Sequence, residues 1–460
     1  MTAFEQSLRQ QLPSNAVISA PAEIAPFVTD WRGIFSGNAI CVVKPYTVED
    51  ISKVVKLARA HGVSLVPQGG NTGLAGGATP LETGLQAVIS MQNMTSIRKV
   101  DREGMTISVE AGCILEKVQH AALDVGRQLP ISFASEGSAT VGGMISTNAG
   151  GINALRYGTV RPNVLGLEVV LSDGTILNGM RSLRKDNSGY DWKQLFIGSE
   201  GTLGVISGAV LRMAPVSGDP ISTFVSVGTP ELAVNLLARL HDRVGDAVTA
   251  FELMSADCVV LSLRYCGGRL PVNPSPWYVL FEVAGSGVDL RSVLESTLAE
   301  AMEQGTVIDA ALSESLAQHQ QFWALRENMG EAERLSGRSV KHDIAVPVPD
   351  VPSFLKKAAS AIHALSPSLK INAFGHVGDG NIHFNILGSE SEEMGKRINR
   401  AVHDVVLQLE GSIAAEHGIG QYRIAEMNRV RDSSEIVLMK QLKQMMDPEN
   451  ILNPGKVIAR

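Results

Sequence analysis

The sequence is poor in cysteine and has no closely spaced pair of cysteines. Its four cysteines are scattered, and no CxxC pair occurs. This excludes a disulfide framework and the usual arrangement of iron–sulfur ligands. We interpret the four residues as small buried side chains in a reducing compartment: Cys41, Cys113, Cys258 and Cys266.

Long apolar runs are also missing. No stretch reaches the roughly 18 consecutive apolar residues that a membrane-spanning helix needs. The segment Met1–Asn15 is polar and mixed in charge, without the apolar centre of a signal peptide. We therefore expect a cytoplasmic protein with no membrane span.

An excess of positive charge is absent as well. The chain has 40 Lys and Arg against 47 Asp and Glu, a net charge of −7. This balance argues against a nucleic-acid partner, which requires a basic patch or stripe. The 460 residues are 44% hydrophobic and 19% charged, as in ordinary globular proteins, and they predict two or three domains.

The most informative segment is a late one, rich in glycine and apolar residues but carrying several polar side chains. Two short strands are expected to meet through the reversal Val377–Asn381 and to form a hairpin. This hairpin would bring His376 and His383 within reach of one ion. With Glu416 they make a common ligand set for zinc that leaves coordination positions open for substrate.

The same segment offers further polar groups. Because strand side chains alternate, His383 and Asn385 are expected on one face of the hairpin. Glu416 and His417 are adjacent, so an extended backbone would point them differently. The alternative is that these are hydrogen-bonded histidines of the core, but clustered titratable groups favour a functional site.

The local sequence pattern divides the chain into three parts: about Ile40–Pro215, rich in strands and glycine loops; about Val216–Gly388, with longer helices and strands; and a last segment with two helices and an end rich in proline and glycine. The middle part predicts an α+β domain with an antiparallel sheet. Helical periodicity is clearest at Val48–His61, Glu231–Val244, Leu290–Gln304, Met394–Glu410 and Ser434–Met446.

Three glycine loops occupy the first part: Pro67–Gly77, Gly137–Gly151 and Phe196–Ile206. They match neither the Walker A pattern nor the GxGxxG fingerprint. One such loop is usually only a tight turn. Three of them favour a large phosphate-bearing cofactor, because successive glycines let backbone N–H groups converge on an anion.

These motifs, in this order, resemble the vanillyl-alcohol oxidase/para-cresol methylhydroxylase (PCMH) flavoprotein family. The hairpin and the tail Asn450–Lys456 resemble its D-2-hydroxyacid dehydrogenase branch, which includes D-2-hydroxyglutarate, D-lactate and glycolate dehydrogenases. The resemblance implies an α+β fold, with a two-subdomain PCMH-type FAD-binding domain at 1–215, an α+β cap domain built on an antiparallel sheet at 216–409 and a C-terminal segment at 410–460. It implies FAD held noncovalently, since the first loop has no His or Cys, and it implies that the C-terminal segment returns to the FAD domain.

The resemblance carries over to individual positions. His376, His383 and Glu416 match metal ligands, usually zinc. The residues matching cofactor contacts are Pro67, Gly69, Gly70, Asn71, Thr72, Gly73, Gly137, Ser138, Thr140, Gly142, Gly143, Ser146, Asn148, Gly150, Tyr157, Gly158, Glu200, Gly201, Gly204, Ile206 and Asn453. Those matching substrate contacts are Arg326, Lys341, Asn385 and His417.

The implied reaction oxidises a small anionic D-2-hydroxyacid. His417 would take the hydroxyl proton, and Arg326 and Lys341 would bind carboxylate groups. D-2-Hydroxyglutarate is the favoured substrate, with D-lactate and glycolate as alternatives. D-2-Hydroxyglutarate enzymes usually carry a threonine four residues after the arginine, where this chain has Gly330.

Other functions stay open. An oxygen-using oxidase of the same fold would share every motif. A metal-dependent hydrolase or a non-catalytic binding module would leave the glycine loops unexplained. As electron acceptor we expect an electron-transfer flavoprotein or a quinone, and a homodimer stays open as the assembly.

Overall fold

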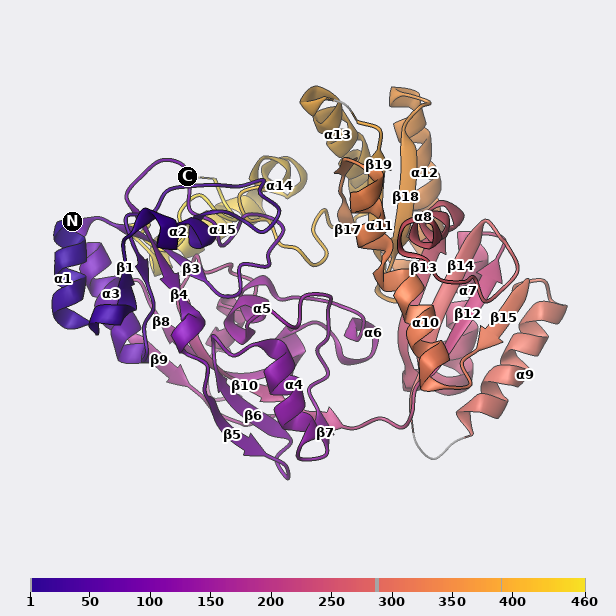
Figure 1. The fold of residues 1–460 in the computed structure, drawn as a ribbon, viewed down its shortest axis with the longest axis horizontal. Helices are drawn as coiled ribbons and strands as arrows, with labels where there is room; N and C mark the ends of the chain where they lie inside the picture. The colour runs from indigo at the N-terminus through magenta and orange to yellow at the C-terminus, as the bar shows by residue number, and fades with distance from the viewer. Residues whose placement is uncertain (1, 286–288, 390, 460) are drawn as a thin grey trace. The chain divides into compact units, whose positions relative to one another are not determined.

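The computed structural model describes residues 2–285, 289–389 and 391–459. These form two compact units, each assembled from separate stretches of the chain (Figure 1). Unit 1 contains Met1–Gly150, Gly158–Val216 and Glu416–Arg460, and unit 2 contains Gly151–Tyr157 and Ser217–Ala415.

Unit 1 contains a four-stranded sheet in the order β1-β2-β4-β3. Its strands β2, β4 and β3 run parallel, and β1 pairs with β2 in the antiparallel sense. The strands are β1 (Val17–Ile18), β2 (Val42–Val43), β3 (Ser64–Gln68) and β4 (Gln86–Ser90). The first glycine loop begins where β3 ends, at the carboxyl end of a parallel strand.

A second, antiparallel sheet of unit 1 has the order β5-β6-β10-β8-β9. Its strands are β5 (Ile97–Asp101), β6 (Thr106–Glu110), β8 (Val164–Val170), β9 (Ile176–Gly179) and β10 (Val205–Arg212). The central strand β10 is buried along nearly its whole length, as expected for a strand covered on both faces. A short pair joins β7 (Arg127–Gln128) to β11 (Ala214–Pro215).

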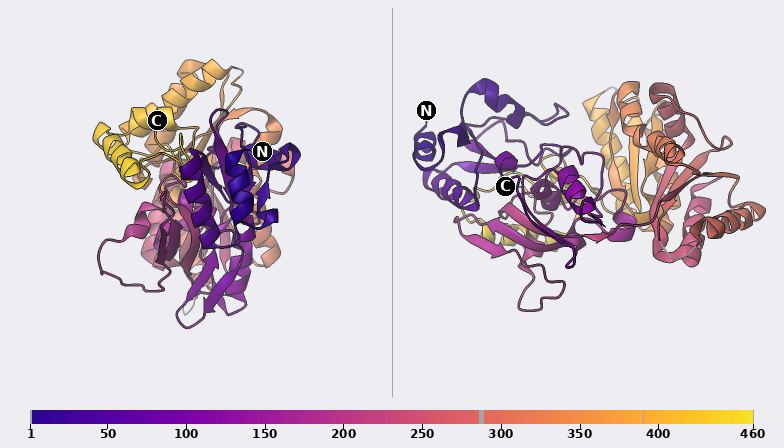
Figure 2. Two further views of the ribbon diagram at one scale, coloured as in Figure 1. Left: turned by 90° about the vertical axis from the view of Figure 1, so that its left-hand side faces the viewer. Right: turned by 60° about the horizontal axis from the view of Figure 1, so that its bottom comes forward.

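Helices of unit 1 follow clear sequence signals. The predicted helix α3 (Val48–His61) has Thr47 as its N-cap and ends at Gly62, whose φ is +63°. It lies beside α1 (Ala3–Gln11) in Figures 1 and 2. The other helices are α2 (Pro21–Val28), α4 (Leu115–Leu123), α5 (Val141–Thr147), α14 (Ile424–Val430) and α15 (Ser433–Met446), with short turns η1 (Ser14–Ala16), η2 (Met91–Asn93), η3 (Arg161–Asn163) and η4 (Trp192–Leu195).

The C-terminal segment is part of the unit 1 core. The N–H of Leu65 in β3 donates to the carbonyl of Ile451 at 2.7 Å, and the N–H of Asn453 donates back to Leu65 at the same distance. Ile451 and Leu452 are buried in the main apolar cluster of the unit. Residues far apart in the sequence therefore complete one sheet edge.

Unit 2 is built on an eight-stranded sheet whose main path is β15-β12-β14-β13-β18-β19-β16, with β17 also paired to β19. Every pairing is antiparallel. The strands are β12 (Ile221–Val227), β13 (Val248–Ser255), β14 (Trp277–Val283), β15 (Asp309–Leu312), β16 (Ser339–Val340), β17 (Asp343–Ala345), β18 (Lys370–Gly375) and β19 (Asn381–Leu387). The antiparallel sheet expected for this region is present.

The helices of unit 2 are α6 (Ala154–Tyr157), α7 (Pro230–Val244), α8 (Ala256–Cys266), α9 (Leu290–Glu303), α10 (Leu316–Glu327), α11 (Met329–Ser336), α12 (Val351–Leu365) and α13 (Glu392–Gln408), with turns η5 (Gly245–Ala247), η6 (Val348–Asp350) and η7 (Val377–Asp379). The ends of α7, α9 and α13 agree with the predicted ones to within two residues. Arg156 ties the short helix α6 into unit 2, since its Nη1 donates to the carbonyl of Ala284 at 2.9 Å.

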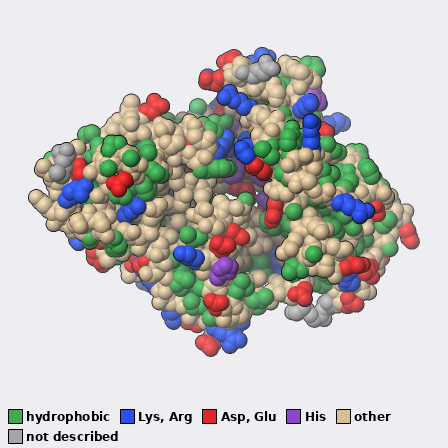
Figure 3. All heavy atoms as spheres, viewed as in Figure 1, with side chains coloured by type: hydrophobic (Ala, Val, Ile, Leu, Met, Phe, Trp, Pro, Cys, Tyr) green, Lys and Arg blue, Asp and Glu red, His purple; other side chains and the backbone are tan. Residues whose placement is uncertain are grey.

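The composition also predicted free cysteines, a surface of mixed charge and no membrane span. All four cysteines are free; Cys41, Cys113 and Cys258 are buried, and Cys266 is partly exposed. Lys and Arg are interspersed with Asp and Glu on the face drawn in Figure 3. In the described ranges, no helix has the length and apolar character that crossing a membrane requires.

Candidate active site

A cavity of about 690 Å³ lies in unit 1, and the three predicted glycine loops line it. The predicted cofactor residues on its wall are Pro67, Gly69, Gly70, Asn71, Thr72, Gly73, Ser138, Thr140, Gly142, Gly143, Ser146, Gly150, Glu200, Gly201, Gly204 and Ile206. Its size and its backbone-rich lining fit a large, extended cofactor.

Two glycines allow the first two loops to pack closely against each other in the cavity wall. A Cβ on Gly69 would lie 2.1 Å from Oγ1 of Thr140, and a Cβ on Gly70 would lie 2.0 Å from the carbonyl oxygen of Ser138. Any side chain at these positions would therefore force the first two loops apart. The glycines keep both backbones at the cavity surface, where their N–H groups can face an anion.

Five predicted cofactor residues lie outside the cavity lining: Gly137, Asn148, Tyr157, Gly158 and Asn453. Asn453 supports the cavity lining without belonging to it. Its Nδ2 donates to the carbonyl oxygens of two lining residues, Gly77 at 2.9 Å and Glu200 at 2.7 Å. Asn148 ends α5 in the left-handed conformation and accepts from the N–H of Arg161. Tyr157 belongs to unit 2, where its hydroxyl lies 3.4 Å from Oγ of Ser217.

Sequence reasoning missed another part of the lining, the segment Phe133–Ser135. It lies just before the second loop, separated from it by Glu136, and it has no glycine, so nothing in its pattern indicated a binding surface. Trp31 also lines the cavity although most of its side chain is exposed.

Glu416 and His417 line the same cavity. Their loop is held by Glu200, whose carboxylate accepts from the N–H of Ile419 at 2.7 Å and from that of Gly420 at 2.9 Å. Burial raises the pKa of Glu200 above its ordinary value, although these two hydrogen bonds oppose the rise. The cavity wall therefore includes an imidazole and a carboxylate on a fixed loop.

The predicted histidine hairpin is present in unit 2 as β18, η7 and β19. Phe374 pairs with His383 across the two strands, and His376 stands where β18 gives way to η7. The turn is tight: Gly380 has φ +84°, and a Cβ there would lie 2.0 Å from the carbonyl oxygen of Val346. The hairpin brings the rings of His376 and His383 to a centroid distance of 5.8 Å.

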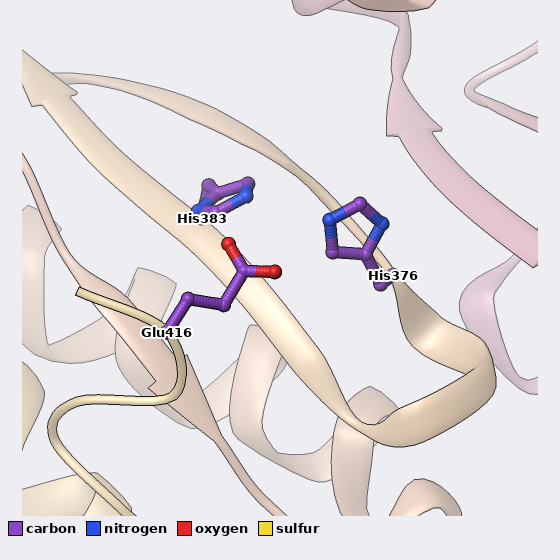
Figure 4. Close-up of side chains that lie close together, drawn as sticks. All are labelled: His376, His383 and Glu416. Carbon is purple, nitrogen blue, oxygen red and sulfur yellow. The ribbon is translucent and has the colours of Figure 1, made fainter. Parts of the chain in front are cut away.

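Glu416 is the first residue beyond unit 2 and is joined to it through Ala415, whose N–H donates to the carbonyl of Asp343 at 3.1 Å. One ligand atom from each of His376, His383 and Glu416 lies within 4.8 Å of the others. Figure 4 shows the Glu416 carboxylate directed toward the two imidazoles. This donor set fits a tetrahedral cation such as zinc with one position open.

A second group of potential ligands overlaps the first. Asp343, Glu416 and His417 also offer one ligand atom each within 4.8 Å of one another. The side chains of Glu416 and His417 thus approach each other, although adjacent residues on an extended backbone were expected to diverge.

Two fully buried glutamates, which sequence reasoning missed, organise the other predicted residues of unit 2. Glu252 on β13 lies 2.7 Å from Nε of Arg326 and 2.5 Å from Nδ1 of His376. Burial opposes ionisation of Glu252, but the charges of His376 and Arg326 outweigh it and hold the pKa at about 2.

Glu333 on α11 is the second glutamate. Its Oε1 lies 3.1 Å from Nζ of Lys341, and its Oε2 accepts from Nδ2 of both Asn385 and Asn372 at 2.7 Å. Oδ1 of Asn385 accepts in turn from the N–H of His342. Asn385 is buried, so its amide is committed to the scaffold at both ends.

Gly330, at the start of α11, is exposed. A Cβ built on it meets no atom within 4 Å. A larger residue would therefore fit at this position without displacing a neighbour.

Two known families match the chain. The FAD binding domain family matches residues 39–179, and the family of FAD linked oxidases, C-terminal domain, matches residues 221–457. The first match covers the first two glycine loops, and the second covers the hairpin and the segment after it.

Curated relatives match over almost the whole chain. The mitochondrial D-2-hydroxyglutarate dehydrogenase of Bos taurus is 35% identical over 96% of this chain and 81% of that protein. The D-2-hydroxyglutarate dehydrogenase of Xanthomonas citri is 34% identical over 98% and 96%. A D-2-hydroxyglutarate–pyruvate transhydrogenase of Saccharomyces cerevisiae is 32% identical over 95% and 90%.

Solved structures of the same fold are more distant in sequence. p-Cresol methylhydroxylase aligns with a TM-score of 0.78 at 16% identity, over 99% of this chain and 96% of that one. Alkyldihydroxyacetonephosphate synthase aligns with a TM-score of 0.77 at 17% identity, over 99% and 84%. They confirm the predicted PCMH-type fold. The family matches and the curated relatives lead to one conclusion: the chain belongs to the FAD-linked oxidase family, and it is an FAD-dependent dehydrogenase.

Proposed function

We propose that this dehydrogenase oxidises a D-2-hydroxyacid to the 2-oxoacid, with D-2-hydroxyglutarate as the favoured substrate. Unit 1 is the FAD-binding domain in this proposal, and unit 2 is the cap domain that carries substrate-binding residues. The names of the relatives support the substrate class, and the chemistry of the cavity and the hairpin supports the reaction.

FAD would be held noncovalently by the glycine loops of unit 1. A covalent tether needs a nucleophilic side chain, and the Pro67–Gly77 loop contains neither His nor Cys. Bound FAD supplies the two-electron acceptor of the reaction. The loops contribute backbone N–H groups for its phosphates and exclude water from the cavity they line.

His376, His383 and Glu416 would hold a divalent cation, for which we propose zinc. Two imidazoles and a carboxylate suit zinc, and a catalytic site keeps one position open. Such a cation supplies Lewis-acid stabilisation of negative charge on a substrate oxygen. The three side chains would determine the position of the cation and therefore which substrate oxygen it stabilises.

The observation that carries the proposal is the position of His417. It is a titratable residue on the wall of the cavity attributed to FAD, on a loop that Glu200 fixes. We assign it the role of general base, which takes the hydroxyl proton of the substrate on an imidazole nitrogen. Imidazole suits this step because its ordinary pKa lies near neutral pH.

Arg326 and Lys341 would bind the carboxylate groups of the substrate. Each is already oriented by a buried carboxylate, Arg326 by Glu252 and Lys341 by Glu333. Pre-oriented cations lose little side-chain entropy when an anion binds, which favours tight and directed binding. Asn385 would then contribute mainly by holding Glu333 in place.

One observation favours a smaller substrate such as D-lactate or glycolate. Where D-2-hydroxyglutarate enzymes usually carry a threonine, Gly330 offers no hydroxyl, so one contact to a distal carboxylate would be missing. Lys341 still supplies a cation for a second carboxylate, and we therefore retain the diacid as the favoured substrate.

Anaerobic bleaching of the flavin absorbance tests the substrate class directly. We expect D-2-hydroxyglutarate to reduce the flavin fastest in a panel with D-malate, D-lactate and glycolate, and the L-enantiomers to be inert. Failure of every member would refute the proposal, and a preference for D-lactate or glycolate would select the alternative.

The electron acceptor needs a separate experiment. We propose an electron-transfer flavoprotein or a quinone, so reoxidation by an artificial dye or a quinone should exceed reoxidation by air. Rapid hydrogen peroxide release in air would instead identify an oxidase.

A further inference from the structure

Glu252 lies in the interior of β13 with its side chain fully buried. Its neighbours on the same face of the strand, Ala250 and Met254, are apolar and buried as well. An ionised carboxylate in such surroundings costs free energy unless charged and hydrogen-bonding groups compensate it. A strand that needed only to pack would carry an apolar residue here.

The two carboxylate oxygens of Glu252 serve different partners. Oε1 lies 2.5 Å from Nδ1 of His376, at the end of β18, and Oε2 lies 2.7 Å from Nε of Arg326, on α10. One residue thus connects a proposed metal ligand with a proposed substrate-binding residue, and all three belong to unit 2.

The contact fixes which nitrogen of His376 can bind a cation. A carboxylate accepts a hydrogen bond, so Nδ1 carries the proton and Nε2 is left as the coordinating atom. The same contact sets the rotation of the imidazole. His376 would therefore be oriented for coordination before any cation arrives.

The side chain of Arg326 is oriented by two contacts. Its Nε is bound to Glu252, and its guanidinium carbon lies 4.8 Å from the centre of the Phe374 ring. Within the described ranges, no hydrogen bond engages either Nη group of Arg326. These groups form the fork that binds a carboxylate with two parallel hydrogen bonds.

We propose that Glu252 is a positioning residue that couples the metal ligand His376 to the substrate-binding Arg326. Its carboxylate orients the imidazole that would bind the cation, and it also orients the guanidinium that would bind the substrate carboxylate. This inference rests on the proposed function, because the roles of both partners come from it.

Glu252→Gln tests the coupling with little change in volume. His376 and Arg326 are bound by different carboxylate oxygens, and a carboxamide has an accepting oxygen at only one of these two positions, so it cannot accept from both partners where they now lie. Its oxygen is also a weaker acceptor than a carboxylate. We expect Zn²⁺ affinity of the metal-free holoflavoprotein, measured by titration calorimetry, to fall about 10- to 100-fold. KM for the hydroxyacid should rise as well.

Glu333→Gln is the matched variant. Glu333 is also a fully buried glutamate of unit 2 paired with a proposed substrate cation, Lys341, but among the described residues no hydrogen bond or ion pair joins it to the three proposed metal ligands. We expect Glu333→Gln to raise KM while leaving Zn²⁺ affinity unchanged. Glu168→Gln, in unit 1, removes the nearer of the two carboxylates paired with Arg98 and controls for general destabilisation.

A second variant keeps the test decisive if the single substitution prevents folding. Glu252→Gln combined with Arg326→Gln leaves no buried guanidinium without a charge partner, so a major cause of misfolding is removed. It still replaces the carboxylate at His376 by a carboxamide. Its Zn²⁺ affinity should be reduced like that of the single variant.

The outcomes separate the inference from the proposed function. If the wild-type protein binds no Zn²⁺, the proposed metal site fails, and the coupling fails with it. If wild type binds Zn²⁺ and the Glu252 variants bind it equally well, only the coupling is overturned. An equal loss in Glu333→Gln would also overturn it, since any buried carboxylate would then have the same effect.

Discussion

Oε1 of Glu200 accepts a hydrogen bond from the backbone N–H of Ile419 at 2.7 Å, across more than two hundred residues of sequence. Together with the bond to Gly420, this contact fixes the loop on which Glu416 and His417 stand. Gly418 permits the approach, because a Cβ there would lie 2.6 Å from the same oxygen. A buried acid therefore controls the position of the proposed base.

The raised pKa of Glu200 predicts a pH dependence of stability. The folded protein keeps this proton to higher pH than the unfolded chain, whose value is near 4.5, so the folded state binds more protons in that window. The free energy of unfolding should therefore fall as pH rises from about 4.5 to the folded pKa, by at most about 1.4 kcal/mol per pH unit. Urea unfolding of the FAD-free protein measures the slope. Glu200→Gln lacks this contribution, and identical slopes in the two proteins would contradict the assignment.

His417→Ala should abolish most turnover without emptying the site. Loss of a positioned general base typically lowers kcat about 10²- to 10⁴-fold. Flavin absorbance and bound metal should stay at wild-type levels, because neither the glycine loops nor His376 and His383 are altered. Stopped-flow flavin reduction measures the effect, with His363→Ala, at an exposed position of α12, as control. Near-normal reduction would remove His417 from the base role.

Chelation should inactivate the enzyme and leave its flavin in place. The proposed metal ligands, His376, His383 and Glu416, are partly accessible, so a strong chelator should extract the cation. Activity should return on adding Zn²⁺, and His383→Asn should abolish that recovery. Full activity after confirmed metal removal would refute the metal-assisted reaction.

Gly330→Thr should improve use of D-2-hydroxyglutarate. Open space surrounds the position, so the side chain enters without a clash and presents a hydroxyl. One added hydrogen bond of about 0.5 to 1.5 kcal/mol corresponds to a KM about 2- to 12-fold lower. Gly330→Ala adds the Cβ without the hydroxyl and should leave KM unchanged. An equal effect of both variants, or on D-lactate as well, would exclude a distal-carboxylate contact.

Local signals in the sequence predicted much of the architecture. Helix α3 begins and ends where Thr47 and Gly62 place its caps, because capping depends on neighbouring residues alone. The hairpin of His376 and His383 was predictable for a similar reason, since Asp379 and Gly380 favour a reversal between two apolar strands. The three glycine loops meet at one cavity as their shared composition indicated.

The buried glutamates were not predictable in the same way. Glu333 stands in a helix beside Glu331 and Arg334, where a charge normally faces solvent, and only the sheet packed against it reveals its burial. Glu252 gave a weak signal, as a single carboxylate within an apolar strand. Its partners Arg326 and His376 are distant in sequence, so only the tertiary structure could identify them.

The interleaved course of the chain has a consequence for biosynthesis. Residues 151–157 are made early but belong to unit 2, most of which follows residue 216. Strand β3 of unit 1 exchanges hydrogen bonds with Ile451 and Asn453, which are made after all of unit 2. Unit 1 therefore cannot finish folding until all of unit 2 has been synthesised, and long-range pairings of this kind form slowly. We expect nascent chains to expose the unfinished edge of β3 until residues 451–453 emerge.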